Sequence, residues 1–430
     1  MMLDTIKKKL AALGCDAWEL TETTNRGWEF YIIRDKLDQN RATEVKTIRV
    51  SVYKSIENGK FLGSASGDIP PTASEAEIDE RLASLLYQAG LVKNPYYTLA
   101  DKPVDVPEKR ERVDVEQIAE SFLRAIRSVE QTKTEDINSY EIFVSEITRH
   151  TLNSNGVEYT CTYPKSTVDM VVNARRDGHE IELYRFYTSG TCDAEKLKSD
   201  ISDVLRFGRD RLTAVPTPKL GTGAVVFSTG DAVEIYDYFL ARMSTAMKYR
   251  KISDWELGKP VVEDAQGDKI SVKALSSLAN SSRDFPVDEE GSVIRDRWII
   301  RDGVAENFFG SRQFSEYLGV KDSSIVYNVR FEGGRASAEE IRGGDYLEVV
   351  EFSDFQIDEM GGDIAGEIRV AYWHHDGKTT VVTGGSVSGN MREAARTMTF
   401  SRETRQYDTH VIPAVTRLEG LRITGVADME

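Results

Sequence analysis

Apolar and polar residues alternate with a period of two along much of the chain, a pattern typical of strands with one buried face. Residues 48–52 follow this pattern, and Asn58-Gly59 supplies a turn into the next strand. The stretch 168–183 alternates on both sides of Asp177-Gly178, a pair that adopts the positive φ of a two-residue hairpin loop. Asp376-Gly377 predicts a further hairpin in the last quarter of the chain.

His179 follows the turn at Asp177-Gly178 and is itself followed by Glu180, as in the H-E-x-x-H motif of zinc peptidases. That motif needs a second histidine four residues later on a helix, so that both imidazoles face one ion. Leu183 occupies that position, and the surrounding period of two predicts a strand. We therefore expect no metal site at His179.

Other stretches show the apolar spacing of amphipathic helices. The clearest is 74–90, where Ser74 and Glu77 form a capping box and Gly90 ends the pattern. Further helices are predicted at the N-terminus up to Gly14, from Asp114, over 193–208, and from about Ala232 to Met247.

Pro216 and Pro218 mark the best candidate for a domain boundary. Before it, helices are mixed with hairpins; after it, strands, glycine turns and loops predominate. The sequence therefore predicts an α+β protein with two domains. Residues 1–212 form an N-terminal domain of helices and antiparallel sheet, and residues 213–430 form a C-terminal β-rich domain, barrel-like or sandwich-like. The proline-containing segment 94–109 is expected to be an extended connection.

Composition narrows the function classes. The 430 residues contain 55 Lys plus Arg against 71 Asp plus Glu, a formal charge of −16. Such a chain is repelled by phosphate backbones, and without a basic stripe we expect no nucleic-acid partner. No apolar run approaches the roughly 18 residues of a membrane helix, so no membrane partner is expected. Three widely spaced cysteines, Cys15, Cys161 and Cys192, favour a reducing compartment, and we expect a cytoplasmic protein.

Two clusters of potential ligands have simpler explanations. His374 and His375 are neighbours on a predicted strand, so they point to opposite faces and are expected to be solvated hairpin residues. The carboxylates of Asp288, Glu289 and Glu290 would bind a hard cation if the loop folded them together, but a charge run is more often a solvated loop.

The segment "VVTGGSVSGN" joins a strand to a short predicted helix through a glycine-rich turn. Its glycines would let a ligand backbone approach closely, and the start of a helix presents free N–H groups. Alternatively, Ser388 or Asn390 simply caps the helix. Residue types alone leave both interpretations open.

In their order and spacing, several segments resemble the TldD/PmbA family, long labelled "modulator of DNA gyrase", and its PmbA (TldE) branch most closely. They are "NSNG" at 153–156, "KYRKISDWELGKPV" at 248–261, "DEEG" at 288–291, "IIRDGVAENFFGSRQFSEYLG" at 299–319 and "VSGNMREA" at 387–394. The resemblance implies a cytosolic, two-component proteolytic system that acts on small or unstructured peptides. In it, a TldD-like subunit carries zinc on H-E-x-x-x-H and a later cysteine.

This chain departs from the zinc-binding pattern. The helix that corresponds to the zinc helix has Asp237 and Tyr238 where His-Glu is expected and contains no histidine, and no cysteine follows Cys192. The family's "GDFS" signature is altered to Ser353-Asp354-Phe355-Gln356. We therefore expect a non-catalytic subunit that binds no zinc itself, with the zinc on a TldD-like partner.

Two functional hypotheses follow. In the first, the chain is a PmbA-like subunit that pairs with a zinc-bearing chain, with itself as a dimer, or with both, and holds an extended peptide by strand addition. In the second, it is a peptide-binding or scaffolding homo-oligomer without a proteolytic partner. No catalytic residues are predicted. The residues predicted to line the peptide cleft are Asp354, Gly385, Ser386, Ser388, Gly389 and Asn390.

Overall fold

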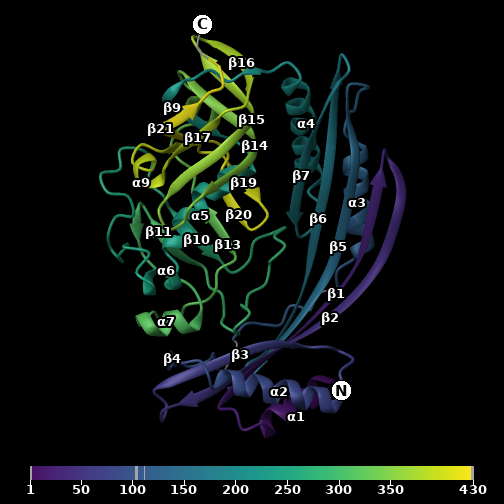
Figure 1. The fold of residues 1–430 in the computed structure, drawn as a ribbon, viewed down its shortest axis with the longest axis vertical. Coiled ribbons are helices and arrows are strands. Elements are labelled where there is room, and N and C mark those ends of the chain that lie inside the picture. The colour runs from purple at the N-terminus through teal and green to yellow at the C-terminus, as the bar shows by residue number, and fades with distance from the viewer. Residues whose placement is uncertain (1, 102–104, 111, 428–430) are drawn as a thin grey trace.

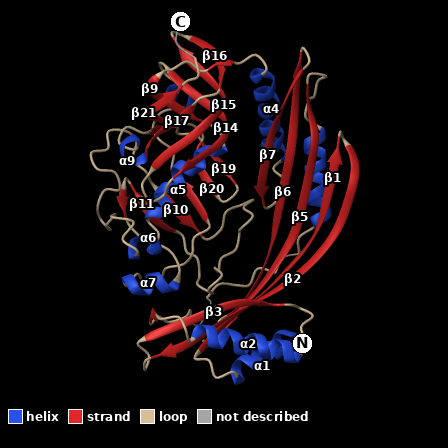
Figure 2. Cartoon of the chain, in the orientation of Figure 1, coloured by secondary structure: helices blue, strands red, loops and turns tan. Residues whose placement is uncertain are grey.

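The computed structural model describes residues 2–101, 105–110 and 112–427. Figure 1 shows long strands curving along one side of the molecule and a β-rich body, built from the C-terminal half, on the other. Two helices pack at the lower end, beside the N-terminus, whereas the C-terminus lies at the opposite end. Figure 2 shows that strands dominate both parts.

The N-terminal half is built on an antiparallel seven-stranded sheet with the order β4-β3-β2-β1-β5-β6-β7. Its long strands form because alternating apolar residues bury one face. The strands are β1 (Ala17–Ile33), β2 (Lys36–Ile56), β3 (Phe61–Ile69), β4 (Asn94–Pro95), β5 (Glu135–Asn153), β6 (Glu158–Arg176) and β7 (His179–Ser189). The predicted hairpins are confirmed: φ is +50° at Asp177 and +81° at Gly178, and both Asn58 and Gly59 also have positive φ.

Helices cover one face of this sheet in two separate cores. Near the lower end, α1 (Met2–Ala12) and α2 (Glu75–Ala89) bury residues such as Ile6 and Leu82 against the sheet. Higher up, α3 (Val115–Arg127) and α4 (Ala194–Arg211) form a second core, which also contains Val350 and Val370 from the C-terminal half. The predicted capping box of Ser74 and Glu77 is present at the start of α2. The predicted connection at 94–109 contains β4, and its Pro103 lies outside the described residues.

The C-terminal half contains a closed barrel, which confirms the predicted fold class. Five strands pair in the order β14-β9-β21-β17-β15, and β14 also pairs with β15, so the ring closes. They are β9 (Gly221–Phe227), β14 (Tyr346–Ile357), β15 (Asp363–His375), β17 (Ser386–Asn390) and β21 (Thr416–Thr424). Outside the ring, β16 (Lys378–Thr383) and β8 (Val215–Pro216) extend the sheet from β15, and β18 (Thr399–Phe400) pairs with β21. The turn between β15 and β16 is the predicted one, with positive φ at Asp376 and Gly377.

A six-stranded sheet packs beside the barrel in the order β12-β11-β10-β13-β20-β19. Its strands are β10 (Val272–Leu275), β11 (Arg297–Arg301), β12 (Val304–Ala305), β13 (Asn328–Phe331), β19 (Thr404–Tyr407) and β20 (His410–Pro413). Barrel, sheet and α5 (Val233–Arg242) share one core, in which Phe227, Phe239 and Phe331 are almost fully buried. Short helices complete this half: η1 (Gly230–Ala232), α6 (Thr245–Tyr249), α7 (Arg312–Leu318), α8 (Ala338–Ile341) and α9 (Met391–Ala394).

The single helix predicted from Ala232 to Met247 is wrong. The chain leaves α5 after Arg242, and Ser244 caps a new helix, α6, by accepting a hydrogen bond from the backbone of Met247. The backbone N–H of Thr245 donates to the carbonyl of Phe309 instead of continuing α5. A serine that competes for backbone N–H groups explains the break.

The predicted domain boundary between residues 212 and 213 stays a prediction. Val350 and Val370 follow that boundary in sequence, yet they belong to the core formed by α3 and α4, which precede it. Among the described residues, no helix combines the length and the apolar character needed to cross a membrane.

Candidate functional site

A cleft of about 1300 Å³ lies between the two halves of the molecule. One wall comes from β7 and α4. The other comes from the end of β9, from α8, and from β14, β15 and β19. Its size exceeds that of a typical small-molecule pocket, and it is open to solvent along one side, so it could accept part of an extended chain.

The free edge of β7 forms part of this cleft. Within the described part of the chain, β7 is the last strand of its sheet and pairs only with β6. Its consecutive residues Arg185 to Ser189 line the cleft. A strand with one open edge presents backbone N–H and C=O groups that another extended chain can pair with. Two hydroxyl groups from the cleft's lining residues, those of Tyr187 and Tyr407, are buried without a hydrogen-bond partner. Buried polar groups are usually paired, so these two could bind a ligand or ordered water.

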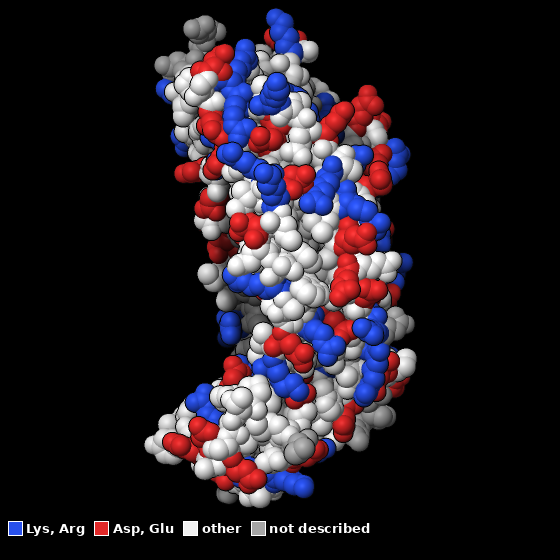
Figure 3. Space-filling view, turned by 90° about the vertical axis from the view of Figure 1, so that its right-hand side faces the viewer, with Lys and Arg blue, Asp and Glu red and all other residues white. Residues whose placement is uncertain are grey.

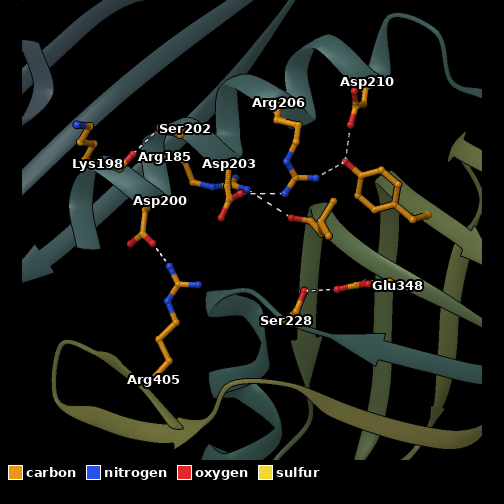
Figure 4. A network of polar contacts seen from close by, with 12 residues as sticks. Arg185, Lys198, Asp200, Ser202, Asp203, Arg206, Asp210, Ser228, Glu348 and Arg405 are labelled. Carbon is orange, nitrogen blue, oxygen red and sulfur yellow. Dashed lines mark hydrogen bonds and ion pairs between the residues drawn. The ribbon is translucent and has the colours of Figure 1, made fainter. Parts of the chain in front are cut away.

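Ion pairs join the two walls. Arg185 on β7 binds Glu351 on β14 through both carboxylate oxygens, with a distance of 2.6 Å from Nη1 to Oε1. Burial raises the pKa of Glu351, and the adjacent guanidinium of Arg185 opposes that shift. Asp200 on α4 pairs with Arg405 on β19, as Figure 4 shows. These contacts fix the relative position of α4, β7 and the C-terminal half.

A second polar group lies deeper in the C-terminal wall. Glu348 on β14 accepts hydrogen bonds from Arg342 and, at 2.6 Å, from the hydroxyl of Ser228 (Figure 4). Burial acts to raise the pKa of Glu348, but the bonds from Arg342 and Ser228 leave it lowered. His374 stacks on Tyr346 with ring centroids 4.2 Å apart and lines the cleft. It is therefore not the solvated hairpin residue that the sequence predicts.

His375 behaves as predicted. It points away from His374, is exposed, and places Nδ1 at 2.8 Å from Asp345. Asp345, His375 and Asp376 bring possible ligand atoms within 4.8 Å of one another. However, all three side chains are exposed, and exposed acidic groups often lie close together without binding an ion.

Helix α5 begins directly after the cleft-lining residues Ser228 to Asp231. Asp237, which the resemblance places where a zinc-binding histidine is expected, lies 2.9 Å from Nε2 of His410 on β20. The spacing of H-E-x-x-x-H places Tyr238 at the glutamate and Arg242 at the second histidine. Glu234 and Glu359 lie close enough to interact with the charge of Asp237. Among the described residues, however, no third His, Cys, Asp or Glu brings a ligand atom within 4.8 Å of both Asp237 and His410, whereas a catalytic zinc site uses three protein ligands.

Arg242 is fully buried at the end of α5. Its guanidinium pairs with Asp254, donates to the carbonyl of Met360 at 3.1 Å, and lies 5.6 Å from the ring of Tyr238 and 5.3 Å from that of Trp255. A positive charge held in this way would repel a divalent cation at the same place.

The structure brings two predicted cleft residues into one row of the barrel. Asp354 on β14 lies opposite Glu367 on β15, which lies opposite Ser386 on β17. Directly paired residues point to the same face of a sheet, and the exposure of Asp354 and Glu367 shows that this is the outer face of the barrel. None of the six predicted residues lines the cleft between the halves.

The glycines of the turn make close contacts within the chain. Gly385 has φ +83°, and a Cβ atom there would lie 2.1 Å from the carbonyl oxygen of Thr424. At Gly389 a Cβ would lie 2.4 Å from a methyl group of Leu421. Ser388 lies opposite Ala365 on β15. Packing within the barrel therefore accounts for both glycines.

Asn390 caps α9. Its side chain accepts a hydrogen bond from the backbone of Arg392 at 2.9 Å and donates to the carbonyl of Gly361 at 3.0 Å and to Asp363 at 2.9 Å. These bonds hold the β14–β15 turn against the start of the helix. The capping interpretation is confirmed by these contacts, whereas a role of the turn in binding peptide stays a prediction.

The acidic loop is only partly solvated: Glu289 is exposed, whereas Asp288 and Glu290 are held by hydrogen bonds within the chain. Asp288 is fully buried and accepts hydrogen bonds from the backbone of Glu290, Ser292 and Ile325. Glu290 accepts from the backbone of Arg312 at the start of α7. Burial raises the pKa of Asp288 to about 6 and that of Glu290 to about 8. His179, as predicted, simply begins β7.

Comparison with known proteins agrees with this arrangement. Residues 220–425 match the family model described as the PmbA/TldA metallopeptidase C-terminal domain. No curated protein sequence matches the chain. Among solved structures, TldE from Thermococcus kodakarensis has 16% identity and a TM-score of 0.77, with 99% of this chain and 100% of that chain covered.

Two bacterial structures named as a "putative modulator" of DNA gyrase have the same fold. The one from Thermotoga maritima has 16% identity and a TM-score of 0.76, covering 98% of this chain and 100% of its own. The one from Bacteroides thetaiotaomicron has 16% identity and a TM-score of 0.77, covering 98% of each chain.

The seven-stranded sheet and the closed barrel give this chain the two-part α+β fold that these solved structures share. Over residues 220–425 the chain is also similar in sequence to the C-terminal domain of the PmbA/TldA metallopeptidases.

Sequence reasoning missed the cleft. Its walls come from segments that are remote in sequence, such as β7 and β19, and no single segment has an unusual composition. The sequence of β7 contains the one available signal. Its apolar residues alternate and predict one buried face, yet Arg185 and Tyr187, which are polar, lie on that same face.

Proposed function

We propose that this chain is a PmbA/TldE-like subunit of a two-subunit peptidase, and that it binds unstructured peptide while a TldD-like partner supplies the zinc. The observation that carries the proposal is the composition of α5. At the H-E-x-x-x-H spacing this helix presents Asp237, Tyr238 and a fully buried Arg242 paired with Asp254. Asp237 and His410 remain as possible ligands, one fewer than the three of known catalytic zinc sites.

The edge of β7 supports the peptide-binding part of the proposal. An extended peptide could add to Arg185–Ser189 as a further strand, with affinity supplied by main-chain hydrogen bonds and little dependence on sequence. The bonds of Arg185 to Glu351 and of Asp200 to Arg405 hold this edge in a fixed position. This favours binding, because a peptide would lose little free energy in ordering the walls of the cleft. This location replaces the second-domain edges as our preferred peptide site.

Elemental analysis and reconstitution test the proposal together. The purified chain should hold no stoichiometric zinc after dialysis and should not cleave an unstructured peptide. Addition of a zinc-bearing family subunit encoded by the same organism should give cleavage that exceeds the activity of that subunit alone.

The matched controls are Asp237→Ala and His410→Ala. One tightly held zinc per chain, lost in either variant, would contradict the argument from α5. Peptide binding without any gain in cleavage would favour the alternative, a peptide-binding homo-oligomer.

A further inference from the structure

The outer face of the N-terminal sheet, opposite α3 and α4, has an acidic centre. Glu141 on β5 lies directly opposite Asp169 on β6, and Tyr31 on β1 lies opposite Glu141. In the adjacent row, Glu29 on β1 lies opposite Arg41 on β2, and the carboxylate of Glu29 accepts a hydrogen bond from Tyr31 at 3.0 Å. Like charges directly opposite each other on a sheet are destabilising, so this arrangement costs the isolated chain some stability.

In the described part of the chain, these three carboxylates are not ion-paired, although the charge of Arg41 acts to lower the pKa of Glu141. Among the described residues, no ion pair within 4.0 Å involves Glu29, Glu141 or Asp169, although many other acidic residues of the sheet have one. The nearby cation, Arg41, donates to Gln39 and lies over the ring of Tyr31 at 5.1 Å. Burial, with the neighbouring charges of Asp169 and Glu29, raises the pKa of Glu141.

Apolar and aromatic side chains surround this acidic centre. On β7, Phe186 lies directly opposite Asp169 of β6 and is 58% exposed, and Tyr184 is 54% exposed. Phe143 packs edge-on against Tyr31 with ring centroids 5.9 Å apart, and Ile33 is 50% exposed. Figure 3 shows one side of the molecule, where Lys, Arg, Asp and Glu side chains surround a mostly uncharged middle region. Exposed apolar patches with a polar centre often mark interaction sites.

We infer that this surface, defined by Glu29, Tyr31, Glu141, Phe143, Asp169, Tyr184 and Phe186, docks a different protein chain that presents arginine side chains among apolar ones. A guanidinium can bind two carboxylates in one plane and stack on the adjacent rings, which a lysine does less well. Arginine and aromatic residues also dominate the energetic centres of protein interfaces.

A second copy of this chain fits the surface poorly. A two-fold interface apposes the same patch on both subunits, so two acidic centres would meet, with Arg41 of each copy as the nearby cation. The formal charge of −16 adds long-range repulsion to that local conflict. The charge pattern therefore selects a partner of opposite charge.

A synthetic peptide tests the inference, and paired variants separate binding at this face from the proposed strand addition at Arg185–Ser189. The probe is an acetylated and amidated heptapeptide in which arginine alternates with valine, and its control carries citrulline, a neutral isostere, in place of arginine. Calorimetric titration should show that the arginine peptide binds at least about tenfold more tightly than the citrulline peptide, as expected for a desolvated charge-assisted contact.

Paired variants assign the binding to this face. Glu141→Gln with Asp169→Asn should remove the preference for arginine. Glu116→Gln with Glu195→Gln, an equal change of charge on α3 and α4, should keep it. Equal affinity for the two peptides, or equal loss in the two double variants, would overturn the inference. A dimer in sedimentation experiments that Phe186→Ser dissociates would also overturn it, because the occupant would then be a second copy.

Discussion

The cleft and the glycine-rich turn of the barrel both contain the residue types expected of a peptide site, but their surroundings differ. In the turn, Gly385 and Gly389 are packed against Thr424 and Leu421, and the bonds of Asn390 are used within the chain. In the cleft, β7 has an unpaired edge, and two buried tyrosine hydroxyls have no partner. Residue type indicates what a site could do, whereas unused hydrogen-bonding capacity indicates where binding remains possible.

The largest effect is expected at Gly385. Gly385→Val would place a branched side chain against the carbonyl of Thr424 at a positive φ, and we expect a loss of about 3–5 kcal/mol in the free energy of unfolding, or failure to fold. Gly178→Val is the matched control. Gly178 also has positive φ, but a Cβ at that position would have no neighbouring atom within 4 Å, so this variant should lose only about 1–2 kcal/mol. Urea denaturation compares them. Equal losses would mean that the packing around Gly385 is unimportant.

Removal of the ion pair across the cleft should have the next largest effect. Arg185→Met leaves Glu351, which is 4% exposed, without its partner, and we expect a loss of about 3 kcal/mol in the free energy of unfolding. Arg26→Met breaks an exposed pair with Glu44 and should cost at most about 1 kcal/mol. If thermal and chemical denaturation give the same stability for both variants, Arg185 does not join the two halves as described.

A smaller effect concerns pH. Burial raises the pKa of Glu19 to about 7 in the folded chain, whereas an unfolded glutamate titrates near 4.3. The folded state therefore binds more protons between these values, and its stability falls as pH rises through this range and levels off above the folded pKa. Glu19→Gln should reduce that fall by about 1–2 kcal/mol between pH 5 and pH 8.

Denaturation midpoints across the pH series measure this effect, with the exposed Glu44→Gln as control. An unchanged pH dependence in Glu19→Gln would show that Glu19 does not titrate in this range. Glu290, with a pKa of about 8, should add to the fall in the same direction.

The smallest effect is expected at Asn390. Asn390→Ala removes the helix cap and the bond to Gly361, and it should cost about 1 kcal/mol. Asn390→Asp, which still accepts from Arg392, should recover part of that loss. If the alanine variant loses peptide affinity while it keeps its stability, the turn itself contacts the ligand.

Local features were predictable because each depends on a few adjacent residues. The Asp177-Gly178 turn, the capping box at Ser74 and the strand at 48–52 follow from backbone preferences and period alone. The break between α5 and α6 was missed because Ser244 caps a helix only when Phe309, far along the chain, accepts the bond from Thr245.

The cleft could not be predicted for a related reason. It exists because α4 and β19 are joined by Asp200 and Arg405, which are 205 residues apart. The burial of Arg242 likewise depends on Asp254, Met360 and Trp255, and a sequence pattern gives no indication of their proximity. The sequence shows that α5 contains no histidine, but it does not show that Arg242 is buried beside Asp254.

The central claim is that peptide binds at the edge of β7 and not at the glycine-rich turn of the barrel. Amide hydrogen exchange with a bound peptide tests this claim most directly, because one experiment measures protection in both regions. Saturation with an unstructured peptide should slow exchange in residues 185–189, where a new strand would pair with the free edge of β7, and should leave residues 386–390 unchanged. Protection of 386–390 without protection of 185–189 would contradict the account and place the peptide on the barrel turn.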